Sequence, residues 1–197
     1  MTSLHDGCPA SRSGTVYWIT GLSGAGKTTV AAALSALLDE VGRAHVRLDG
    51  DAMRPIFAEA DRYDRQSRLA LARRYSGLCK LIADQGLDVV CSTISLFGEI
   101  HRWNRANLRH YVEVFLDVDA ETRHRRDSKG LYGRVRDGAV TDVAGVDLAV
   151  ELPESPDLTV CNDGREPPRR IAEAILAAGR RGDAVVPGAA GCPGAAG

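Results

Sequence analysis

A three-layer α/β/α sandwich built on a five-stranded parallel sheet is the fold that this chain of 197 residues predicts. Short runs rich in β-branched and aromatic residues, typical of buried strands, alternate with longer segments of helical character. Strands that are separated by helices run parallel, and a parallel sheet needs helices over both of its faces. A glycine-rich turn joins the first strand to the first helix, which is the usual setting of a phosphate-binding turn.

The expected elements follow one another in a regular order. The strands span residues 15–20, 44–48, 87–92, 111–117 and 158–161, and the helices span 30–38, 62–85, 98–108, 120–126 and 168–181. The first helix is rich in Ala and Leu, Gly86 is placed to close the second helix as its C-cap, and Pro168 suits the first turn of the last helix. Residues 127–150 are Gly-rich and charged with little periodicity, which predicts a mobile lid.

A single domain accounts for residues 14–181, because a chain of this length can bury a full core. Residues 1–13 are polar without periodicity and residues 182–197 are rich in Gly, Ala and Pro, so we expect two disordered tails. Five scattered cysteines without a CxxC pair favour a reducing cytoplasm. With a net charge of −1, no apolar leader and no run of about 18 apolar residues, we expect neither nucleic acid nor a membrane as a partner.

The turn after the first strand fits the phosphate-loop pattern of Gly, four residues, Gly, Lys and Ser or Thr, which indicates the P-loop nucleoside-triphosphate hydrolase fold. Backbone N–H groups and the positive end of a helix converge there, which suits the triphosphate of ATP or GTP. Lys27 would reach the β- and γ-phosphates, and the Thr28 hydroxyl would hold Mg²⁺. The alternative is a Gly-rich turn without a ligand. The predicted nucleotide-binding residues are Gly21, Leu22, Ser23, Gly24, Ala25, Gly26, Lys27, Thr28 and Thr29.

Polar residues also follow the next two strands, at the edge of a parallel sheet where ligands bind. Asp49-Gly50-Asp51 offers one carboxylate to orient Mg²⁺ and one to accept a proton from an attacking hydroxyl, or is simply an Asp-Gly turn. Ser92-Thr93-Ile94-Ser95 follows the third strand. Because an Asn-Lys-x-Asp guanine signature is missing, phosphoryl transfer to a small molecule fits better than a GTPase switch. Basic residues that can neutralise phosphate charge, or else form solvated helix faces, are Arg54, Arg68, Arg73, Arg74, Arg123, Arg125, Arg126 and Lys129.

These residues resemble the adenylylsulfate (APS) kinase family. The Lys-Gly-Leu-Tyr element after Arg-Asp is far more specific than the phosphate loop alone. The resemblance implies a P-loop kinase, usually dimeric, that moves the ATP γ-phosphate to the 3′-hydroxyl of a nucleotide with an activated 5′ group. The matching segments come in the family's order over about residues 15–162: the phosphate loop, Leu48–Asp51 with Arg54, Ile94-Ser95-x-Phe97, Arg126-Asp127-x-Lys129-Gly130-Leu131-Tyr132, and Gly145-Val146-Asp147 to Pro153.

By position, the resemblance implies a role for each matching residue. Asp49 and Asp51 match the Mg²⁺ and base carboxylates, and Thr28 and Asp49 are then the metal ligands beside the catalytic Lys27. Lys129 matches a lid lysine that contacts phosphates, and Ser95 matches a serine near the transferred group. The implied substrate ligands are Asp51, Arg54, Arg68, Ile94, Ser95, Lys129, Gly130 and Leu131, whereas Arg123 and Arg126 would lie near the ATP adenine.

Several positions depart from the family's pattern. Ala52 replaces the Asn of Asp-Gly-Asp-Asn, Leu71-Ala72 replaces the Asn-Ile of Asn-Ile-Arg-Arg, and Leu96 replaces a Pro. Val143 stands where the family has a Phe that stacks on the substrate adenine, and losing such a ring removes on the order of 1–3 kcal/mol of base recognition. Together with Trp103-Asn104-Arg105, these changes resemble a divergent branch that acts on other activated nucleotides, such as a cytidine diphosphoramidate.

Taken with the phosphate loop, the resemblance therefore implies an ATP- and Mg²⁺-dependent homodimeric kinase whose acceptor is APS or a related nucleotide. Two alternatives remain: a P-loop kinase of a non-nucleotide alcohol, and a nucleotide-binding regulator without turnover. The regulator would be expected to lose at least one catalytic residue, yet Lys27, Thr28, Asp49, Asp51 and Lys129 are all present.

Overall fold

The computed structural model describes residues 13–57, 64–126, 143–146 and 148–181. Each strand and helix expected from the sequence is present, with ends shifted by up to three residues. None of the helices in these ranges is both long and apolar enough to cross a membrane. The order is β1 (Thr15–Thr20), α1 (Lys27–Glu40), β2 (His45–Asp49), α2 (Gly50–Ile56), α3 (Arg65–Ala83), β3 (Asp88–Ser92), α4 (Gly98–Asn107), β4 (His110–Asp117), α5 (Ala120–Arg125), β5 (Leu158–Cys161) and α7 (Pro168–Arg181).

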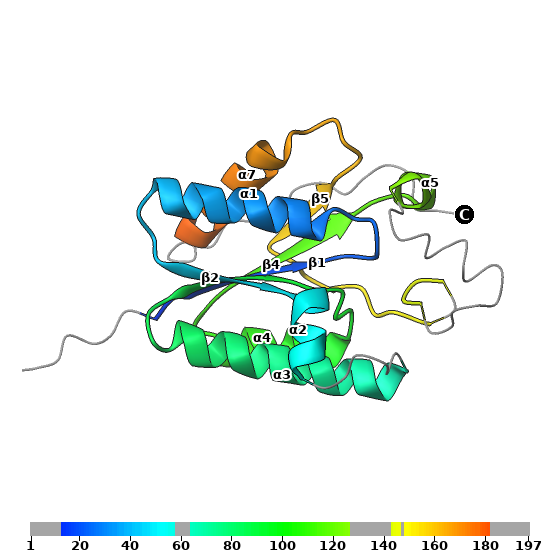
Figure 1. Ribbon diagram of the computed structural model, residues 1–197, viewed down its shortest axis with the longest axis horizontal. Coiled ribbons are helices and arrows are strands. Elements are labelled where there is room, and N and C mark those ends of the chain that lie inside the picture. The colour runs from blue at the N-terminus through cyan, green and yellow to red at the C-terminus, as the bar shows by residue number, and fades with distance from the viewer. Residues whose placement is uncertain (1–12, 58–63, 127–142, 147, 182–197) are drawn as a thin grey trace, which may run out of the picture.

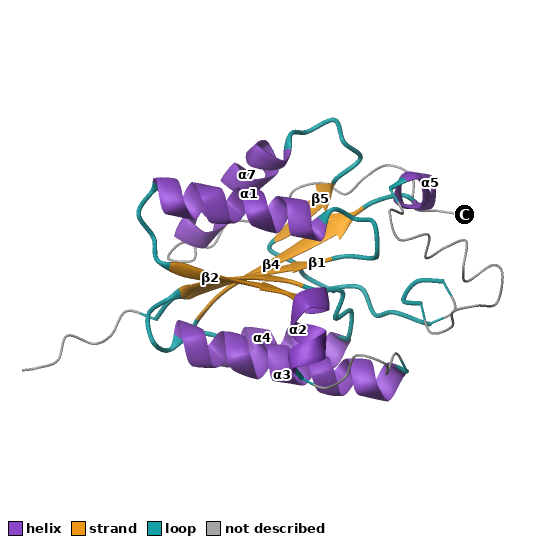
Figure 2. Cartoon of the chain, in the orientation of Figure 1, coloured by secondary structure: helices purple, strands orange, loops and turns teal. Residues whose placement is uncertain are grey.

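The strands form one five-stranded sheet in the order β2-β3-β1-β4-β5, and every neighbouring pair is parallel. Helices α1 and α7 cover one face of this sheet, and α3 and α4 cover the other (Figure 1). Figure 2 shows the strands as a layer between these two layers of helices. The predicted three-layer sandwich is confirmed, and the carboxyl ends of β1, β2 and β3 meet at one edge of the sheet.

Each face of the sheet has its own apolar core. Tyr17 and Ile19 of β1 pack against α1 and α7, whereas Val16 and Trp18 pack against α3 and α4. All four side chains are fully buried. A central parallel strand is covered on both faces, and this is why the apolar residues Val16–Ile19 of β1 follow one another without alternating with polar residues.

Helix α2 was not expected from the sequence. It spans seven residues, contains Pro55 and buries only Met53. The carboxylate of Asp49 caps it by accepting the backbone N–H groups of Asp51 and Ala52. The Asp-Gly-Asp segment is therefore the start of a helix and not a plain turn.

The second expected helix is shorter at both ends than the sequence suggested. It begins at Arg65, where the Asp64 side chain accepts the N–H of Ser67 as an N-cap. The helix ends at Ala83 with Asp84 as its C-cap, so the assignment of Gly86 as the C-cap was wrong. Gly86 instead occupies the left-handed region (φ 90°) in the turn that leads into β3, a conformation that favours glycine.

A buried ionic cluster fastens α4 to β4. Glu113 of β4 is 2% exposed, and its carboxylate contacts His101 Nδ1 and accepts hydrogen bonds from Arg105 Nη2 (3.1 Å) and the Tyr111 hydroxyl (3.1 Å). Burial alone would raise the pKa of Glu113, but the contacts with His101 and Arg105 outweigh it and hold the pKa below its ordinary value. The cluster therefore contributes to stability while Glu113 is ionised.

Replacing Glu113 by Gln is expected to lower the free energy of unfolding at pH 7 by about 3 kcal/mol, because breaking a buried ion pair leaves its partners uncompensated. A depressed pKa contributes stability above the unfolded value of about 4.3, and this contribution is lost as the pH falls through the lower folded value. The difference in the free energy of unfolding between E113Q and the parent protein, measured by urea titration, should thus become smaller below about pH 4. Glu154→Gln is the control, because that carboxylate is 83% exposed. An E113Q variant as stable as E154Q at pH 7 would contradict this account.

Candidate active site

The phosphate loop joins the end of β1 to the start of α1, which begins at Lys27 with Gly26 as its N-cap. Gly24 and Gly26 have φ values of 79° and 86°, in the left-handed region. A Cβ atom added at Gly24 would lie 2.8 Å from the carbonyl oxygen of Arg123, and one at Gly26 would lie 2.5 Å from Nδ2 of Asn162. The loop is therefore packed against α5 on one side and the end of β5 on the other.

The first turn of α1 carries no side-chain cap and no acidic residue. Helix N-termini of this kind present backbone N–H groups and a partial positive charge, which together attract anions. Lys27 adds a full charge at the same place: its Nζ donates to the carbonyl of Leu22 (2.9 Å), which also accepts the N–H of Ala25 (3.1 Å). The predicted phosphate-binding groups thus converge at one end of α1.

Asp49 lies beside this loop at the end of β2. Its Oδ2 accepts hydrogen bonds from the hydroxyls of Thr28 (2.8 Å) and Ser92 (3.0 Å), while Oδ1 accepts the N–H of Asp51 (3.0 Å). Burial alone would raise the pKa of Asp49, but the hydrogen bonds from Thr28, Ser92 and the α2 backbone together hold the pKa below its ordinary value. The carboxylate is therefore ionised near neutral pH and fixed in orientation.

The residues present suit a magnesium ion. Thr28 Oγ1 and Asp49 Oδ2 are adjacent hard oxygen donors, and Mg²⁺ is typically held by one or two protein oxygens together with phosphates and water. Among the described residues, no group of three or more His, Cys, Asp and Glu side chains could hold a metal on its own. A Mg²⁺ ion here would therefore depend on a bound nucleotide.

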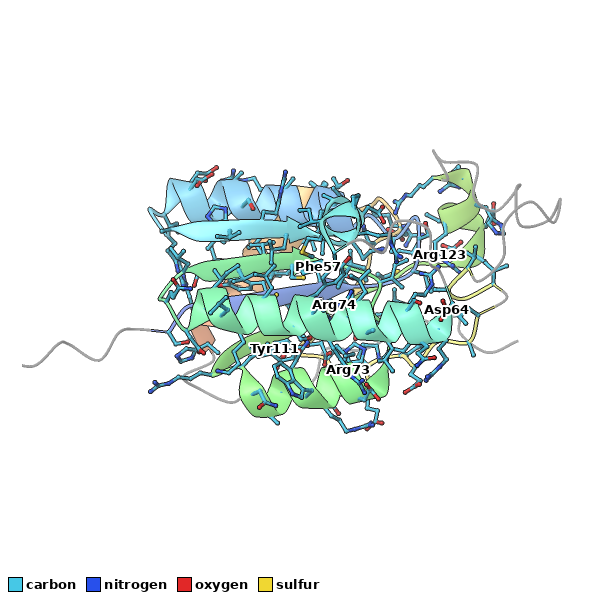
Figure 3. The ribbon with its side chains drawn as sticks, turned by 60° about the horizontal axis from the view of Figure 1, so that its bottom comes forward. Phe57, Asp64, Arg73, Arg74, Tyr111 and Arg123 are labelled. Atoms are coloured by element: carbon cyan, nitrogen blue, oxygen red, sulfur yellow. The ribbon has the colours of Figure 1, made fainter. Side chains whose placement is uncertain are left out.

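Asp51 differs from Asp49 in its surroundings. It is exposed in the first turn of α2, a helix tethered to α3 by the hydroxyl of Tyr75, which donates to the carbonyl of Gly50 (2.8 Å). Burial raises the pKa of Tyr75, so this phenol stays a neutral donor. The ring of Phe57, directly after α2, packs against Tyr75 with centroids 5.8 Å apart. Figure 3 labels Phe57 and also Arg74 of α3.

The segment after β3 is held in an unusual backbone conformation. Ser95 has a φ of 27° and is 8% exposed, and its hydroxyl shares a hydrogen bond with Thr93 (2.8 Å). The preceding carbonyl of Ile94 accepts the hydroxyl of Thr20 at the end of β1. A non-glycine residue at positive φ is uncommon and is often found at functional sites.

The predicted arginines lie on three different elements. Arg54 on α2 and Arg68 on α3 are half-buried. Arg123 on α5, labelled in Figure 3, donates from Nε to the carbonyl of Val118 (3.1 Å), and its backbone borders Gly24. Arg126 follows α5 and donates from Nη1 to the carbonyl of Asn162 (2.7 Å). Arg123 and Arg126 thus connect the α5 region with the phosphate loop and with Asn162 beside it.

Part of the predicted lid lies outside the described residues, including Lys129, Gly130 and Leu131. Its far end is described and packs against the phosphate loop: a Cβ atom at Gly145 would lie 2.6 Å from the side chain of Leu22. Val143 is 4% exposed, so it is buried here and not presented on a surface. The backbone of this segment therefore reaches the expected nucleotide site.

Asn162 at this site was not expected from the sequence, and Ser92 was expected only as part of the polar segment after the third strand, without a role of its own. Ser92 ends β3 and Asn162 follows β5, so their position at the carboxyl edge of the sheet was the available signal. A hollow of about 280 Å³ lies elsewhere, against α4 and beside Glu154 and Ser155. None of its lining residues belongs to the predicted site.

A phosphate loop at the carboxyl edge of a parallel sheet, with a fixed carboxylate beside its threonine, defines a P-loop kinase as the class of this protein. Within this class the chain belongs to the adenylylsulfate kinase family, because the family model described as adenylylsulphate kinase matches residues 13–161. Accordingly, the protein is a phosphotransferase with an alcohol group as acceptor.

Individual relatives agree with this assignment. The cytidine diphosphoramidate kinase of Campylobacter jejuni is 37% identical over 82% of this chain and 94% of its own length. The adenylyl-sulfate kinase of Pseudomonas aeruginosa is 35% identical over 81% of this chain and 83% of its own. The Mycobacterium tuberculosis APS kinase, solved in complex with AMPPNP and APS, superimposes with a TM-score of 0.78 at 31% identity, covering 84% of this chain and 97% of that one.

Proposed function

We propose that this protein transfers the γ-phosphate of ATP to the 3′-hydroxyl of an activated 5′-nucleotide, either APS or a related substrate such as cytidine diphosphoramidate. The observation that carries this proposal is the Asp49–Thr28 hydrogen bond (2.8 Å) at the phosphate loop, which joins a carboxylate to the expected Mg²⁺ ligand. Relatives of both substrate types lie at similar identity, 37% and 35%, so identity alone does not choose between the acceptors.

The residues around the phosphate loop suggest a separate role for each in the reaction. Hydrogen bonds from Thr28 and the α2 backbone fix Asp49, which suits a metal ligand. Asp51 is exposed and therefore accessible, so it is the better group to take the proton from the attacking hydroxyl. Lys27 and the α1 N–H groups hold the phosphates in line for attack, and a bound Mg²⁺ would neutralise phosphate charge. Closure of the 127–150 segment over the site would exclude water and suppress ATP hydrolysis.

The remaining ligands follow from the family resemblance. Arg123 and Arg126 would border the adenine of ATP. We further propose a homodimer in the cytoplasm, which sedimentation and cell fractionation would test. The acceptor would be bound by Arg54, Arg68, Ile94, Ser95, Lys129, Gly130 and Leu131.

The test is ADP release from Mg-ATP with APS and cytidine diphosphoramidate supplied in parallel. Turnover with APS alone would assign the protein to sulfate activation, and turnover with the cytidine compound would mean that the substitutions at Ala52, Leu71 and Val143 rebuilt the base pocket. ADP release that neither nucleotide stimulates would overturn the proposal and favour a non-nucleotide alcohol or a regulator.

Val143→Phe is expected to raise the affinity for adenine-containing acceptors about tenfold, because an aromatic ring contributes roughly 1–3 kcal/mol of stacking on a base. Since Val143 is 4% exposed, a larger side chain has to displace its neighbours. Val143→Leu is the matched control, because it adds volume without a ring. Acceptor dissociation constants together with thermal unfolding separate the two effects. An unchanged or weaker affinity in the Phe variant would contradict the stacking account.

A further inference from the structure

Asn162 occupies the point where β5 meets the phosphate loop. Its backbone N–H donates to the carbonyl of Asp117 (3.1 Å), which continues the pairing of β5 with β4 beyond the last strand residue. The residue is 8% exposed, and its side chain turns toward the loop, where Nδ2 donates to the carbonyl of Ala25 (2.8 Å). A buried amide thus bridges segments that are 137 residues apart in the sequence.

This hydrogen bond fixes the direction of one peptide group in the loop. The carbonyl of Ala25 and the N–H of Gly26 belong to the same planar, trans peptide, so they point in opposite directions. Because Asn162 holds the carbonyl toward β5, the N–H of Gly26 must face away from β5. Gly26 is the N-cap of α1, so its N–H is among the groups expected to bind phosphate.

The same residue also holds Arg126. The carbonyl of Asn162 accepts a hydrogen bond from Arg126 Nη1 (2.7 Å). The other terminal nitrogen of Arg126, Nη2, lies 3.0 Å from the position that a Cβ atom would take if Gly164 carried one. Arg126 is the residue proposed to border the ATP adenine. Asn162 therefore contacts, through its side chain and its backbone, the two protein segments that would hold opposite ends of ATP.

We propose that Asn162 is a positioning residue for the nucleotide: its side-chain amide orients the Ala25–Gly26 peptide toward the phosphates. The inference rests on the proposed function only in taking a purine nucleotide as the occupant of the phosphate loop. The acceptor plays no part in it.

The experiment compares Asn162→Asp, Asn162→Ala and the parent protein. The Asp variant keeps the shape against Gly26 but replaces the N–H donor by an oxygen that faces the Ala25 carbonyl. Calorimetry with Mg-ADP should give a dissociation constant raised about tenfold in the Asp variant and about three- to tenfold in the Ala variant, as expected for the loss of one buried hydrogen bond. Binding of adenosine, which has no phosphate, should change less than twofold.

Asp163→Ala is the matched control. The Asp163 carboxylate accepts a hydrogen bond from the backbone N–H of Arg165 and forms an ion pair with its side chain, so this variant should bind ADP as the parent protein does. Parent-like ADP binding in both Asn162 variants would overturn the proposal. So would an equal loss of ADP and adenosine affinity together with a lower Tm, since that pattern indicates a purely structural role.

This test separates the inference from the proposed function. If the parent protein binds Mg-ADP but phosphorylates no nucleotide, the proposed function is wrong. The role of Asn162 is then still tested by the ADP affinities of its variants. A parent protein that does not bind Mg-ADP would overturn both.

Discussion

Lys27→Ala is expected to lower turnover at least about tenfold to a hundredfold, the usual size of such electrostatic terms in catalysis. Lys27 is the first residue of α1, and its ammonium group lies within the phosphate loop, bonded to the Leu22 carbonyl at 2.9 Å. Phosphoryl transfer depends on positioning and on neutralising charge on the transferred group, so removal of this cation acts on the step itself. The measurement is the steady-state rate of acceptor-dependent ADP release.

The control for this variant is Lys80→Ala on α3. Lys80 forms an ion pair with Asp84 (2.7 Å), but an exposed pair of this kind contributes little to the stability of the fold. Thermal unfolding of both variants would establish that the loop change does not unfold the protein. A near-parent rate for Lys27→Ala, with Lys80→Ala equally active, would sink the assignment of Lys27 as catalytic.

The strands and the phosphate loop could be predicted because their signals are local. β1 is buried along its whole length and carries the continuous apolar run Val16–Ile19, since both faces are covered. Gly-x4-Gly-Lys-Thr lies in eight consecutive residues. The short α2 was missed because a glycine, a proline and one buried side chain give no periodic pattern. Its N-cap, Asp49, was noticed for its chemistry and not as a helix signal.

Residues whose role depends on distant contacts could not be predicted. Asn162 matters through a hydrogen bond to Ala25, and no local pattern encodes a contact across 137 residues. The positive φ of Ser95 arises where the chain leaves β3, with the Ile94 carbonyl bonded to Thr20 of β1, so it depends on the assembled sheet. The burial of Val143 likewise reflects packing between segments that are remote in the sequence.

The sequence also left open which of the two neighbouring aspartates is the base, and we propose Asp51 from the different surroundings of the two residues. Asp49 accepts hydrogen bonds from two hydroxyls and from the α2 backbone, so its lone pairs are largely used. Asp51 lies two residues further along, in the first turn of α2, and is exposed. A base needs an accessible lone pair that can reach the acceptor hydroxyl, whereas a metal ligand gains from being fixed.

Asp51→Asn is therefore expected to lower turnover at least about tenfold to a hundredfold, with the affinity for Mg-ATP nearly unchanged. The substitution keeps the shape of the side chain, and loss of one carboxylate from the first turn of α2 costs only about 0.3–1 kcal/mol of helix stability. Asp49→Asn should instead raise the Mg²⁺ concentration needed for half-maximal rate, because it removes a charged oxygen beside Thr28. Rates are measured as acceptor-dependent ADP release over a Mg²⁺ titration.

Asp39→Asn is the matched control for these two variants, because its carboxylate is 76% exposed and lies at the far end of α1 from the phosphate loop. A near-parent rate for Asp51→Asn at saturating Mg²⁺ would show that the proton leaves without this carboxylate. The reverse pattern, in which Asp51→Asn shifts the Mg²⁺ dependence and Asp49→Asn does not, would exchange the two roles. Either result is independent of the acceptor's identity, because both variants are compared with the parent protein on one and the same substrate.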